Sequence, residues 1–348
     1  MDLNNNSCIN RKEIPRTAIV ILNKDNERGL EKTLTSLSRQ TLPPCEYFDI
    51  FIVDGGSRDG SREVATRFSR EIKCIYFIEQ RIKGGTGPAR REIIEILRNK
   101  NYQLVVWGDS ENEYYPDYVE NILRKYLVER SRDPESIMII SGRSIVRRDS
   151  IWSRLFYWYH GYHQIFPVGV GDRHAPGNNK AEEISIYDLY TYPPCIRSED
   201  FIFSYYLYKN FRDKVRYFYE EKARVLVSIP RSFREILSWQ RNRVRGLVQC
   251  SRYIGLRYPP DLIYWTIFLL INILLISATL FLKSLVSSIT LVVMIVSTWI
   301  FLYIRGRSAL ERIDLASGFL GYIGLLLHAF FTLYYSIYFL AKEKSRSD

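Results

Sequence analysis

The sequence has few cysteines, and no two of them form a CxxC motif. Five occur among the 348 residues, at Cys8, Cys45, Cys74, Cys195 and Cys250. An odd number excludes complete pairing into disulfides within the chain. Scattered single cysteines are typical of a cytosolic domain. We therefore expect these thiols to be reduced.

The first residues lack the apolar stretch of a secretory signal peptide. Residues 1–15 read MDLNNNSCINRKEIP, which is mostly polar and which we interpret as a short tail. A signal peptide needs a run of about 7–15 apolar residues. We therefore expect the domain that follows to stay in the cytoplasm.

Long apolar runs are absent before residue 262 and frequent after it. Residues 262–282, 285–304 and 315–340 are three such runs. Each is long enough to cross a hydrocarbon layer of about 30 Å, and single polar residues such as Asn272 or His328 do not offset the surrounding Leu, Ile, Phe and Val. The sequence predicts a multi-pass cell-membrane protein with its transmembrane region at 261–341 and a tail at 342–348.

Acidic residues are too few to balance the basic ones, and the net charge is +11. Residues 222–257 hold one acidic residue, Glu235, and nine basic ones: Lys222, Arg224, Arg231, Arg234, Arg241, Arg243, Arg245, Arg252 and Arg257. Because this segment adjoins the first span, the positive-inside rule places it on the cytoplasmic face, where each basic residue contributes about 1 kcal/mol with anionic lipids. A nucleic acid is the usual alternative partner of a basic cluster, but we expect none beside a bilayer.

The charges of the loops between the spans do not decide on which side of the membrane the tail at 342–348 lies. With the first domain inside, Lys283 lies in the outer loop, and the inner loop holds Arg305, Arg307 and Arg312. The tail then ends outside, although it carries Lys342, Lys344 and Arg346. A third segment that re-enters the bilayer or lies in its interface removes this conflict.

Residues 16–230 show the alternation of an α/β domain. Apolar strand patterns occupy residues 16–22, 47–53, 74–78 and 104–107, and residues 29–40, 61–70 and 91–99 have helical periodicity. Short connections between alternating strands and helices require a doubly wound, mostly parallel sheet. Residues 136–146 supply a further strand.

Two carboxylates one residue apart follow the strand at 104–107. Asp109 and Glu111 stand directly after Gly108. Ligands of open α/β sheets bind beyond the carboxyl ends of the strands. Hard oxygen donors there suit Mg²⁺ or Mn²⁺ carrying a phosphate-bearing ligand. An ordinary acidic turn is the alternative.

Glycines and charged residues follow two other strands. Asp54 is placed to accept hydrogen bonds from a nucleobase or ribose, and Gly55 and Gly56 permit close approach of a ligand to the backbone. The glycine loop at 83–90 runs into a helix start, where Lys83 and Arg90 suit a diphosphate. A capped turn and a flexible loop are the structural alternatives.

The order of these motifs resembles the family-2 glycosyltransferases, which have the GT-A fold. The matching segments are residues 24–27 (KDNE), 53–59 (VDGGSRD), 87–90 (GPAR), 109–111 (DSE), 198–200 (SED) and 240–244 (QRNRV, similar to QxxRW). Three positions depart from the family. Glu111 replaces the second Asp of DxD, Gly55 replaces an acid, and Val244 replaces Trp, for which Trp239 is a candidate substitute.

The resemblance implies roles for individual residues. Asp200, with Glu199 beside it, corresponds to the general base, and Asp109 and Glu111 to the metal ligands. The nucleotide-binding set is Asp25, Asp54, Lys83, Arg90 and Asp109. Gln240 and Arg243 correspond to groups that bind the acceptor or the diphosphate. As alternatives, residues 198–200 cap a helix, and Gln240 and Arg243 belong only to basic interfacial helices at 231–260.

The implied function is an inverting membrane glycosyltransferase. It takes a nucleotide-diphosphate sugar, by default a UDP-sugar with GDP-mannose as the alternative, and transfers the sugar to a lipid-linked or saccharide acceptor. A processive polysaccharide synthase is a second interpretation, which three spans support only if chains associate as a homo-oligomer. A membrane scaffold with a degenerate sugar-nucleotide-binding domain is a third.

An aromatic segment and a polar loop separate the metal motif from residues 198–200. The pattern at 151–166 predicts an amphipathic helix with Trp152, Phe156, Tyr159 and His163 on one face, either at the lipid headgroups or in an ordinary core. His160 and His163 lack a third ligand nearby, so we expect no metal there. The resemblance places the loop at 169–180 near the donor sugar or the acceptor.

Overall fold

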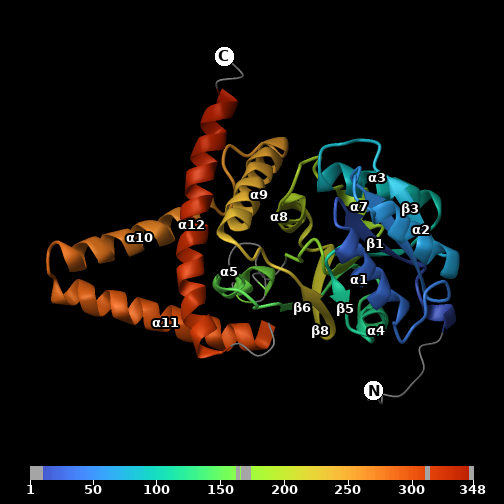
Figure 1. The fold of residues 1–348 in the computed structure, drawn as a ribbon, viewed down its shortest axis with the longest axis horizontal. Coiled ribbons are helices and arrows are strands. Elements are labelled where there is room, and N and C mark those ends of the chain that lie inside the picture. The colour runs from blue at the N-terminus through green and yellow to red at the C-terminus, as the bar shows by residue number, and fades with distance from the viewer. Residues whose placement is uncertain (1–10, 162–164, 166–173, 310–313, 345–348) are drawn as a thin grey trace. The chain divides into compact units, whose positions relative to one another are not determined.

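The computed structural model describes residues 11–161, 165, 174–309 and 314–344 (Figure 1). His163 and the first part of the loop at 169–180 lie outside these residues. The chain divides into two compact units. Unit 1 comprises Met1–Arg143, Ala175–Tyr192 and Phe203–Val227, and unit 2 comprises Ser144–His174, Pro193–Ile202 and Ser228–Asp348.

Unit 1 contains a mixed, mostly parallel sheet. The order of the eight strands in the described part of the chain is β3-β2-β1-β4-β7-β6-β8-β5. The strands are β1 (Thr17–Asn23), β2 (Phe48–Asp54), β3 (Ile75–Glu79), β4 (Leu104–Asp109), β5 (Glu113–Tyr114), β6 (Ile137–Val146), β7 (Lys180–Glu183) and β8 (Val215–Val227). The first four are parallel, whereas β4 pairs with β7, β7 with β6 and β8 with β5 in antiparallel fashion. The predicted parallel sheet is confirmed, and the antiparallel half was not foreseen beyond β6.

The parallel strands form because their side chains are apolar on both faces. Every residue of β1 is buried, and β2 and β4 are nearly as buried, as expected for strands with helices on both sides. The helices of this unit are α1 (Glu27–Ser38), α2 (Ser61–Glu71), α3 (Thr86–Asn99), α4 (Tyr118–Arg132), α7 (Ile186–Leu189) and most of α8 (Glu199–Phe211). A core that includes Val20, Phe51, Ile93 and Trp107 lies between α3 and the sheet.

The register of the parallel strands brings polar residues to one edge. Asn23 of β1 pairs with Asp54 of β2, and Leu22 pairs with Asp109 of β4. Asp54 also pairs with Glu79, the last residue of β3. The four carboxyl ends therefore stand at one level, as the rule for ligand sites in open α/β sheets requires.

Unit 2 is mostly helical. Its helices are α5 (Ile151–Leu155), the 3-10 helix η2 (Tyr157–Gly161), α9 (Phe233–Tyr253), α10 (Leu262–Leu280), α11 (Leu285–Ala309) and α12 (Leu315–Lys344), and it includes the start of α8. Figure 1 shows α10 and α11 joined by a short turn and α12 as one long helix.

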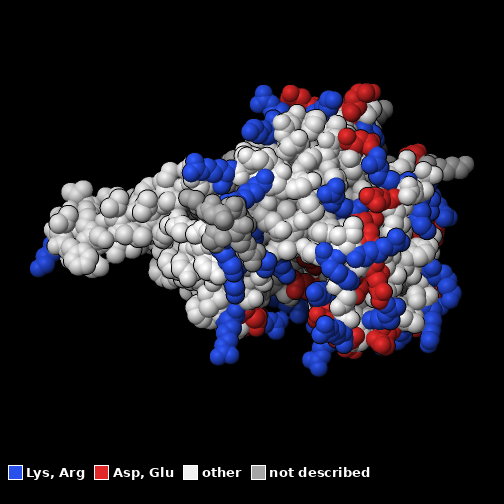
Figure 2. All heavy atoms as spheres, turned by 90° about the horizontal axis from the view of Figure 1, so that it is seen from above, with Lys and Arg blue, Asp and Glu red and all other residues white. Residues whose placement is uncertain are grey.

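Three of these helices are long and apolar enough to cross a membrane: Leu262–Leu280, Leu285–Gly306 and Leu315–Lys342. Ile263 and Leu274 of α10 are 72% and 67% exposed. The part of the surface formed by α10 and α11 is almost free of charge in Figure 2. Such a surface is unfavourable in water and suits lipid. The three predicted apolar helices are confirmed.

The prediction of reduced thiols is wrong for four of the cysteines. Cys45 is paired with Cys74, and Cys195 with Cys250. Because β2 and β3 pair in parallel from Ile50 and Ile75 onward, the residues that precede both strands lie at one edge of the sheet. This proximity depends on strand pairing and has no counterpart in sequence spacing. The cysteines therefore give no support to a cytosolic location.

The aromatic segment does not form the single helix predicted for residues 151–166. Helix α5 ends at Leu155, and η2 covers Tyr157–Gly161. Phe156, Tyr157 and Trp158 are consecutive and all buried. The rings are buried against different neighbours, since Phe156 contacts Trp239 whereas Trp158 contacts Trp265 and His328.

Candidate active site

The loops after β1 and β2 are bound to each other. Asn23 Nδ2 donates to Asp54 Oδ1 over 2.8 Å, and Gly55 N donates to the Asn23 carbonyl over 2.8 Å. Asp25 Oδ1 accepts from Arg58 N over 2.7 Å, and the Asp25 amide donates to Ser57 Oγ over 2.8 Å. These bonds join the two predicted nucleotide-binding motifs, residues 24–27 and 53–59, into one polar platform.

Asp54 is the centre of this platform. Its Oδ1 accepts from Asn23 and from Ser57 Oγ, and its Oδ2 accepts from the amides of Gly56 and Ser57 over 2.9 and 2.8 Å. Burial raises the pKa of Asp54, but these hydrogen bonds outweigh burial and hold the pKa below its usual range. A carboxylate offers about four acceptor positions, so loop groups occupy the acceptor capacity of Asp54. Its predicted contact with a nucleotide stays a prediction.

The glycine loop after β3 brings a cation to the platform. Gly56 has φ +87°, a left-handed conformation, and a β-carbon built on it would lie 3.0 Å from Lys83 Nζ. The ammonium group of Lys83 therefore stands beside the Asp54 turn. Lys83 is exposed at the start of the segment that leads into α3. This position suits a diphosphate bound at the helix start.

The turn after β4 presents the two predicted metal ligands. Asp109 is partly exposed and Glu111 is exposed. Asn26 Nδ2 donates to the Ser110 carbonyl over 3.1 Å. The turn is anchored by Asn112, whose Nδ2 donates to the Asn178 carbonyl over 2.7 Å and whose own carbonyl accepts from Thr33 Oγ1. Asp109 and Glu111 are thus carried by a fixed turn at the same edge as the platform.

These two carboxylates fit a divalent cation. Among the described residues, no group of three or more His, Cys, Asp and Glu is placed to hold a metal ion. Mg²⁺ and Mn²⁺ do not require such a group, because they are commonly bound by one or two carboxylates together with water and substrate phosphates. The donor set of Asp109 and Glu111 is therefore chemically suitable.

Arg90 lies deeper than its predicted role suggested. Its side chain is buried, its Nη2 donates to the Gly177 carbonyl over 2.6 Å, and its guanidinium lies 4.4 Å from the centre of the Trp107 ring. This guanidinium links α3 to β4 and to the segment before β7. Its contact with a diphosphate stays a prediction.

Sequence reasoning missed a buried ion pair on β7. Lys180 Nζ and Glu182 Oε1 are 2.7 Å apart, and both side chains are fully buried. Glu182 also accepts hydrogen bonds from Trp107 Nε1, Tyr187 and Tyr192. Burial raises the pKa of Glu182, but Lys180 and these donors lower it overall, so the carboxylate is ionised at neutral pH. The segment KAEE resembles an exposed strand, and no local signal marks it as core.

In unit 2, Glu199 and Asp200 begin α8. Glu199 is buried, Asp200 is partly exposed, and Asp200 Oδ1 accepts from the Phe201 amide over 2.9 Å. Ser198 has φ +61°, and its hydroxyl donates to the Arg243 carbonyl of α9 over 3.0 Å. A β-carbon on Gly246 would lie 2.7 Å from the Arg197 carbonyl carbon. The segment before α8 is therefore packed directly on α9.

Gln240 and Arg243 are bonded to each other and to α12. Arg243 Nε donates to Gln240 Oε1 over 2.9 Å, and Arg243 Nη2 donates to Thr332 Oγ1. Gln240 Nε2 lies 3.1 Å from His328 Nδ1. The predicted pair is thus hydrogen-bonded to residues of an apolar helix, a link that sequence spacing does not reveal.

The aromatic residues of η2 lie against the same helices. The Tyr159 ring is 4.6 Å from that of Trp239, whereas Val244 is buried against Val248 and Phe339. Burial lowers the pKa of His160 to about 4, against the opposing effects of the Ser228 backbone and Asp200. The imidazole is therefore neutral at pH 7. A metal pair of His160 with His163 cannot be described, since His163 lies outside the described residues.

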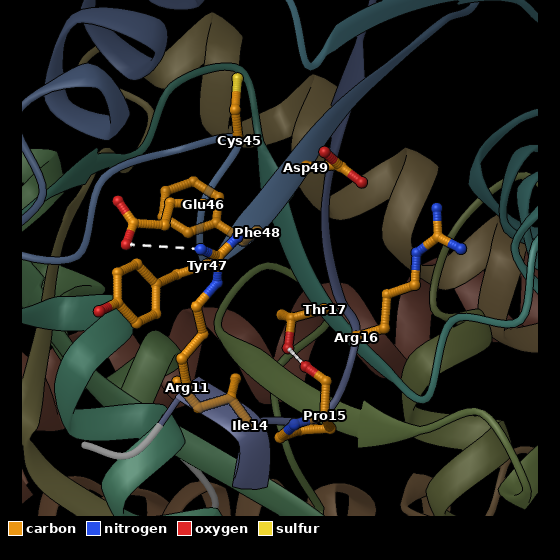
Figure 3. A pocket seen from close by; sticks show the side chains of 10 residues that line it. All are labelled: Arg11, Ile14, Pro15, Arg16, Thr17, Cys45, Glu46, Tyr47, Phe48 and Asp49. Atoms are coloured by element: carbon orange, nitrogen blue, oxygen red, sulfur yellow. Dashed lines mark hydrogen bonds and ion pairs between the residues drawn. The ribbon is translucent and has the colours of Figure 1, made fainter.

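A cavity of about 300 Å³ lies at the amino ends of β1 and β2, opposite to the carboxyl ends that carry the candidate site (Figure 3). It is lined by Arg11, Arg16, Tyr47 and Asp49 among others, and by Thr17 and Phe48, which begin β1 and β2. None of the predicted site residues lines it. The candidate site is therefore defined by the loops at the carboxyl ends of the strands, not by this cavity.

In sequence and in fold the chain is similar to known glycosyltransferases. Residues 18–164 match the family described as Glycosyl transferase family 2. A mannosyltransferase from Pyrobaculum calidifontis, PcManGT, solved in complex with GDP-Man and Mn²⁺, superposes with a TM-score of 0.58 over 93% of this chain and 89% of that one, at 16% identity. Glycosyltransferase AglE from Haloferax volcanii is 28% identical over 82 residues, and the succinoglycan biosynthesis protein ExoA from Rhizobium meliloti is 25% identical over 111.

The fold is GT-A, and three apolar helices follow it. The family match covers less than half of the 348 residues. The aligned segments cover 24% and 32% of this chain and 27% and 33% of AglE and ExoA.

Proposed function

We propose that the protein is an inverting membrane glycosyltransferase that uses a nucleotide-diphosphate sugar. The observation that carries the proposal is the edge of the sheet where four parallel strands end in register. There the platform around Asp54, the ammonium of Lys83 and the turn with Asp109 and Glu111 come from four successive loops. Carboxylates for a metal and a cation for phosphates at such an edge suit a sugar nucleotide.

The proposed roles follow from charge. Asp109 and Glu111 would hold Mg²⁺ or Mn²⁺, which when bound neutralises the departing diphosphate. Lys83 adds positive charge for the same phosphates. Asp200 removes the proton from the acceptor hydroxyl as that oxygen attacks the anomeric carbon. Direct attack inverts the configuration and requires no covalent enzyme intermediate.

The donor and acceptor are proposed by chemical class. The family resemblance favours a UDP-sugar, and the GDP-Man bound by PcManGT keeps GDP-mannose as the alternative. A lipid-linked acceptor is supported by three helices suited to a bilayer and by the basic segment that precedes them, with the catalytic domain on the cytoplasmic face.

Release of free nucleoside diphosphate tests the activity. The full chain in native membranes is incubated with Mn²⁺ and a panel of UDP- and GDP-sugars, and the released UDP or GDP is measured. We expect release with one donor that depends on an acceptor in the membrane. No release with any donor would contradict the proposal and favour a binding scaffold. Gel analysis of the product distinguishes single transfer from polymer formation. Polymer formation is the alternative because Gln240 and Arg243 belong to a QxxRW-like motif.

Variants of the metal ligands and the base test the roles. Asp109→Asn should lower turnover at least 100-fold, because it removes a charged ligand, whereas Glu111→Asp restores the DxD form and should keep metal-dependent activity. Asp200→Asn should abolish transfer and leave binding of UDP with Mn²⁺ nearly unchanged in calorimetry. Unchanged turnover of Asp200→Asn would remove Asp200 from the mechanism.

A further inference from the structure

Arg243 is a buried cation held by neutral groups. Its side chain is only 6% exposed, and its hydrogen bonds go to Gln240 and Thr332. None of the ion pairs formed by the described residues includes Arg243. Its positive charge favours the ionised form of the buried Asp261, but burial still raises the pKa of that carboxyl, so Asp261 compensates the cation only in part. A buried charge is costly unless it is paired. The arrangement therefore suits an anionic group supplied by a ligand.

The direction of the hydrogen bonds fixes the orientation of this cation. Arginine only donates, so the oxygen of the Gln240 amide must face Arg243. The amide nitrogen of Gln240 then faces His328, and His328 Nδ1 must accept from it. A neutral imidazole with its proton on Nε2 satisfies this requirement. The chain of bonds runs from α12 through Gln240 to Arg243 and returns to α12 at Thr332.

The imidazole of His328 is itself held in place. It is 2% exposed, and its ring centre lies 4.7 Å from that of Trp265 and 5.2 Å from that of Trp158. Thr332 stands one helical turn further along α12, and its hydroxyl donates to the His328 carbonyl over 2.7 Å. Both residues therefore present fixed acceptors to the α9 pair. Polar side chains inside an otherwise apolar helix are costly in a membrane and are commonly functional.

We propose that His328 and Thr332 of α12 are positioning residues that hold Gln240 and Arg243 ready to bind a substrate phosphate. This inference rests on the proposed transferase function and gives α12 a binding role within unit 2 besides its suitability as a membrane helix. The phosphate belongs either to the nucleotide diphosphate of the donor or to a lipid phosphate of the acceptor. Both present the same oxyanion to a guanidinium.

Four variants separate positioning from packing. His328→Phe keeps an aromatic ring between the two tryptophans and removes the acceptor, and His328→Asn can restore an acceptor near Nδ1. Thr332→Val removes the hydroxyl at nearly constant volume. Ser336→Ala is the matched control, because Ser336 lies one turn beyond Thr332, is fully buried, and has a hydroxyl that no described group hydrogen-bonds.

The test measures ligand binding by the full chain in detergent micelles. UDP with Mg²⁺ represents the donor, and farnesyl phosphate represents a lipid phosphate. We expect His328→Phe and Thr332→Val to weaken binding of one of these ligands about tenfold, with His328→Asn close to wild type and Ser336→Ala unchanged. The ligand affected identifies the source of the phosphate. Equal affinities of wild type and His328→Phe for both ligands, or no binding of either ligand by wild type, would overturn the inference.

Kinetics distinguish this inference from the proposed function. If wild type transfers sugar and His328→Phe lowers its melting temperature without changing KM or kcat, then the residue only packs and the inference fails alone. If wild type transfers no sugar but its phosphate binding depends on His328, the inference stands and the transferase proposal fails. A rise in KM for one substrate, reversed in His328→Asn, is the expected result.

Discussion

At the scale of single residues, the buried charges of unit 1 act as structural anchors beside the site. Glu182 connects β7 to Trp107 of β4, and Trp107 lies two residues before Asp109. The Arg90 guanidinium lies over the same indole ring. The Glu182 carboxylate accepts hydrogen bonds from three neutral donors and forms an ion pair with Lys180. These interactions offset the free-energy cost of burying its charge.

Replacing Glu182 should lower the free energy of unfolding more than replacing its partner Lys180. Glu182→Leu leaves the Lys180 charge buried and removes an acceptor shared by three donors, so we expect a loss of about 3–5 kcal/mol in the free energy of unfolding. Lys180→Met should cost less, because Trp107, Tyr187 and Tyr192 still donate to Glu182. Thermal unfolding of both variants in detergent measures the difference. Equal costs would show that the three donors contribute little.

The Asp54 platform should give the protein an acid-sensitive stability. Because the pKa of Asp54 is lower in the folded chain than the unfolded value of about 3.9, its contribution is present above that value and is lost as pH falls through the folded pKa. Asp54→Asn should cost about 1–3 kcal/mol at pH 7 and lose less further stability between about pH 5 and pH 3 than wild type. Melting temperatures across this range test the prediction.

Asp213→Asn is the control for that experiment, since the Asp213 side chain is 93% exposed. Its melting temperature should follow that of wild type at every pH. If the melting temperature of Asp54→Asn changes with pH as that of wild type does, Asp54 is not responsible for the acid-sensitive stability.

At the scale of elements, α12 has a face of small residues that receives the aromatic segment. Gly321 and Gly324 are spaced three apart and share this face, whereas Gly318 faces Trp299 of α11. A β-carbon on Gly324 would collide with the Leu155 carbonyl, and one on Gly321 would lie 3.1 Å from Leu302 and Tyr157 side chains. Small residues permit such close approach of backbones. The aromatic segment is therefore placed by packing on α12, within unit 2.

Two glycine substitutions test this packing. Gly324→Ala meets backbone that cannot move aside, so we expect a loss of about 1–3 kcal/mol or more in unfolding free energy. Gly321→Ala meets only side-chain atoms, which need to move by a few tenths of an ångström, and it gains up to about 1 kcal/mol of helix propensity, so it should be nearly neutral. Melting temperatures of the two full-length variants provide the comparison. A larger loss for Gly321→Ala would contradict this account of the face.

At the scale of the whole molecule, the distribution of basic residues predicts which side of the membrane each loop lies on. The short turn between α10 and α11 contains Lys283, and the basic segment of α9 adjoins the start of α10. With that segment in the cytoplasm, the turn lies outside. In a Cys8→Ser background, Lys283→Cys should react with a membrane-impermeant maleimide on intact cells, and Asp213→Cys only after lysis. The opposite labelling would reverse the topology.

The sequence alone determined the parallel half of the sheet, the loops at its carboxyl ends and the three apolar helices. Strand periodicity, glycines and apolar runs are local signals, so the loops that carry Asp54 and Asp109 could be placed from a few neighbouring residues each. The roles of Asp25, Glu199, Asp200 and the other site residues stay predictions, since they depend on ligands.

Only the tertiary structure decided which distant groups meet. Glu182 joins Trp107, Arg243 joins Thr332, and Cys45 joins Cys74 across intervals that carry no sequence signature. The end of α5 at Leu155, where three consecutive buried aromatic rings follow, was likewise not visible in the local pattern. Local periodicity specifies the elements, whereas burial of a charge or a ring depends on what the rest of the fold places beside it, and that information is not contained in any short segment.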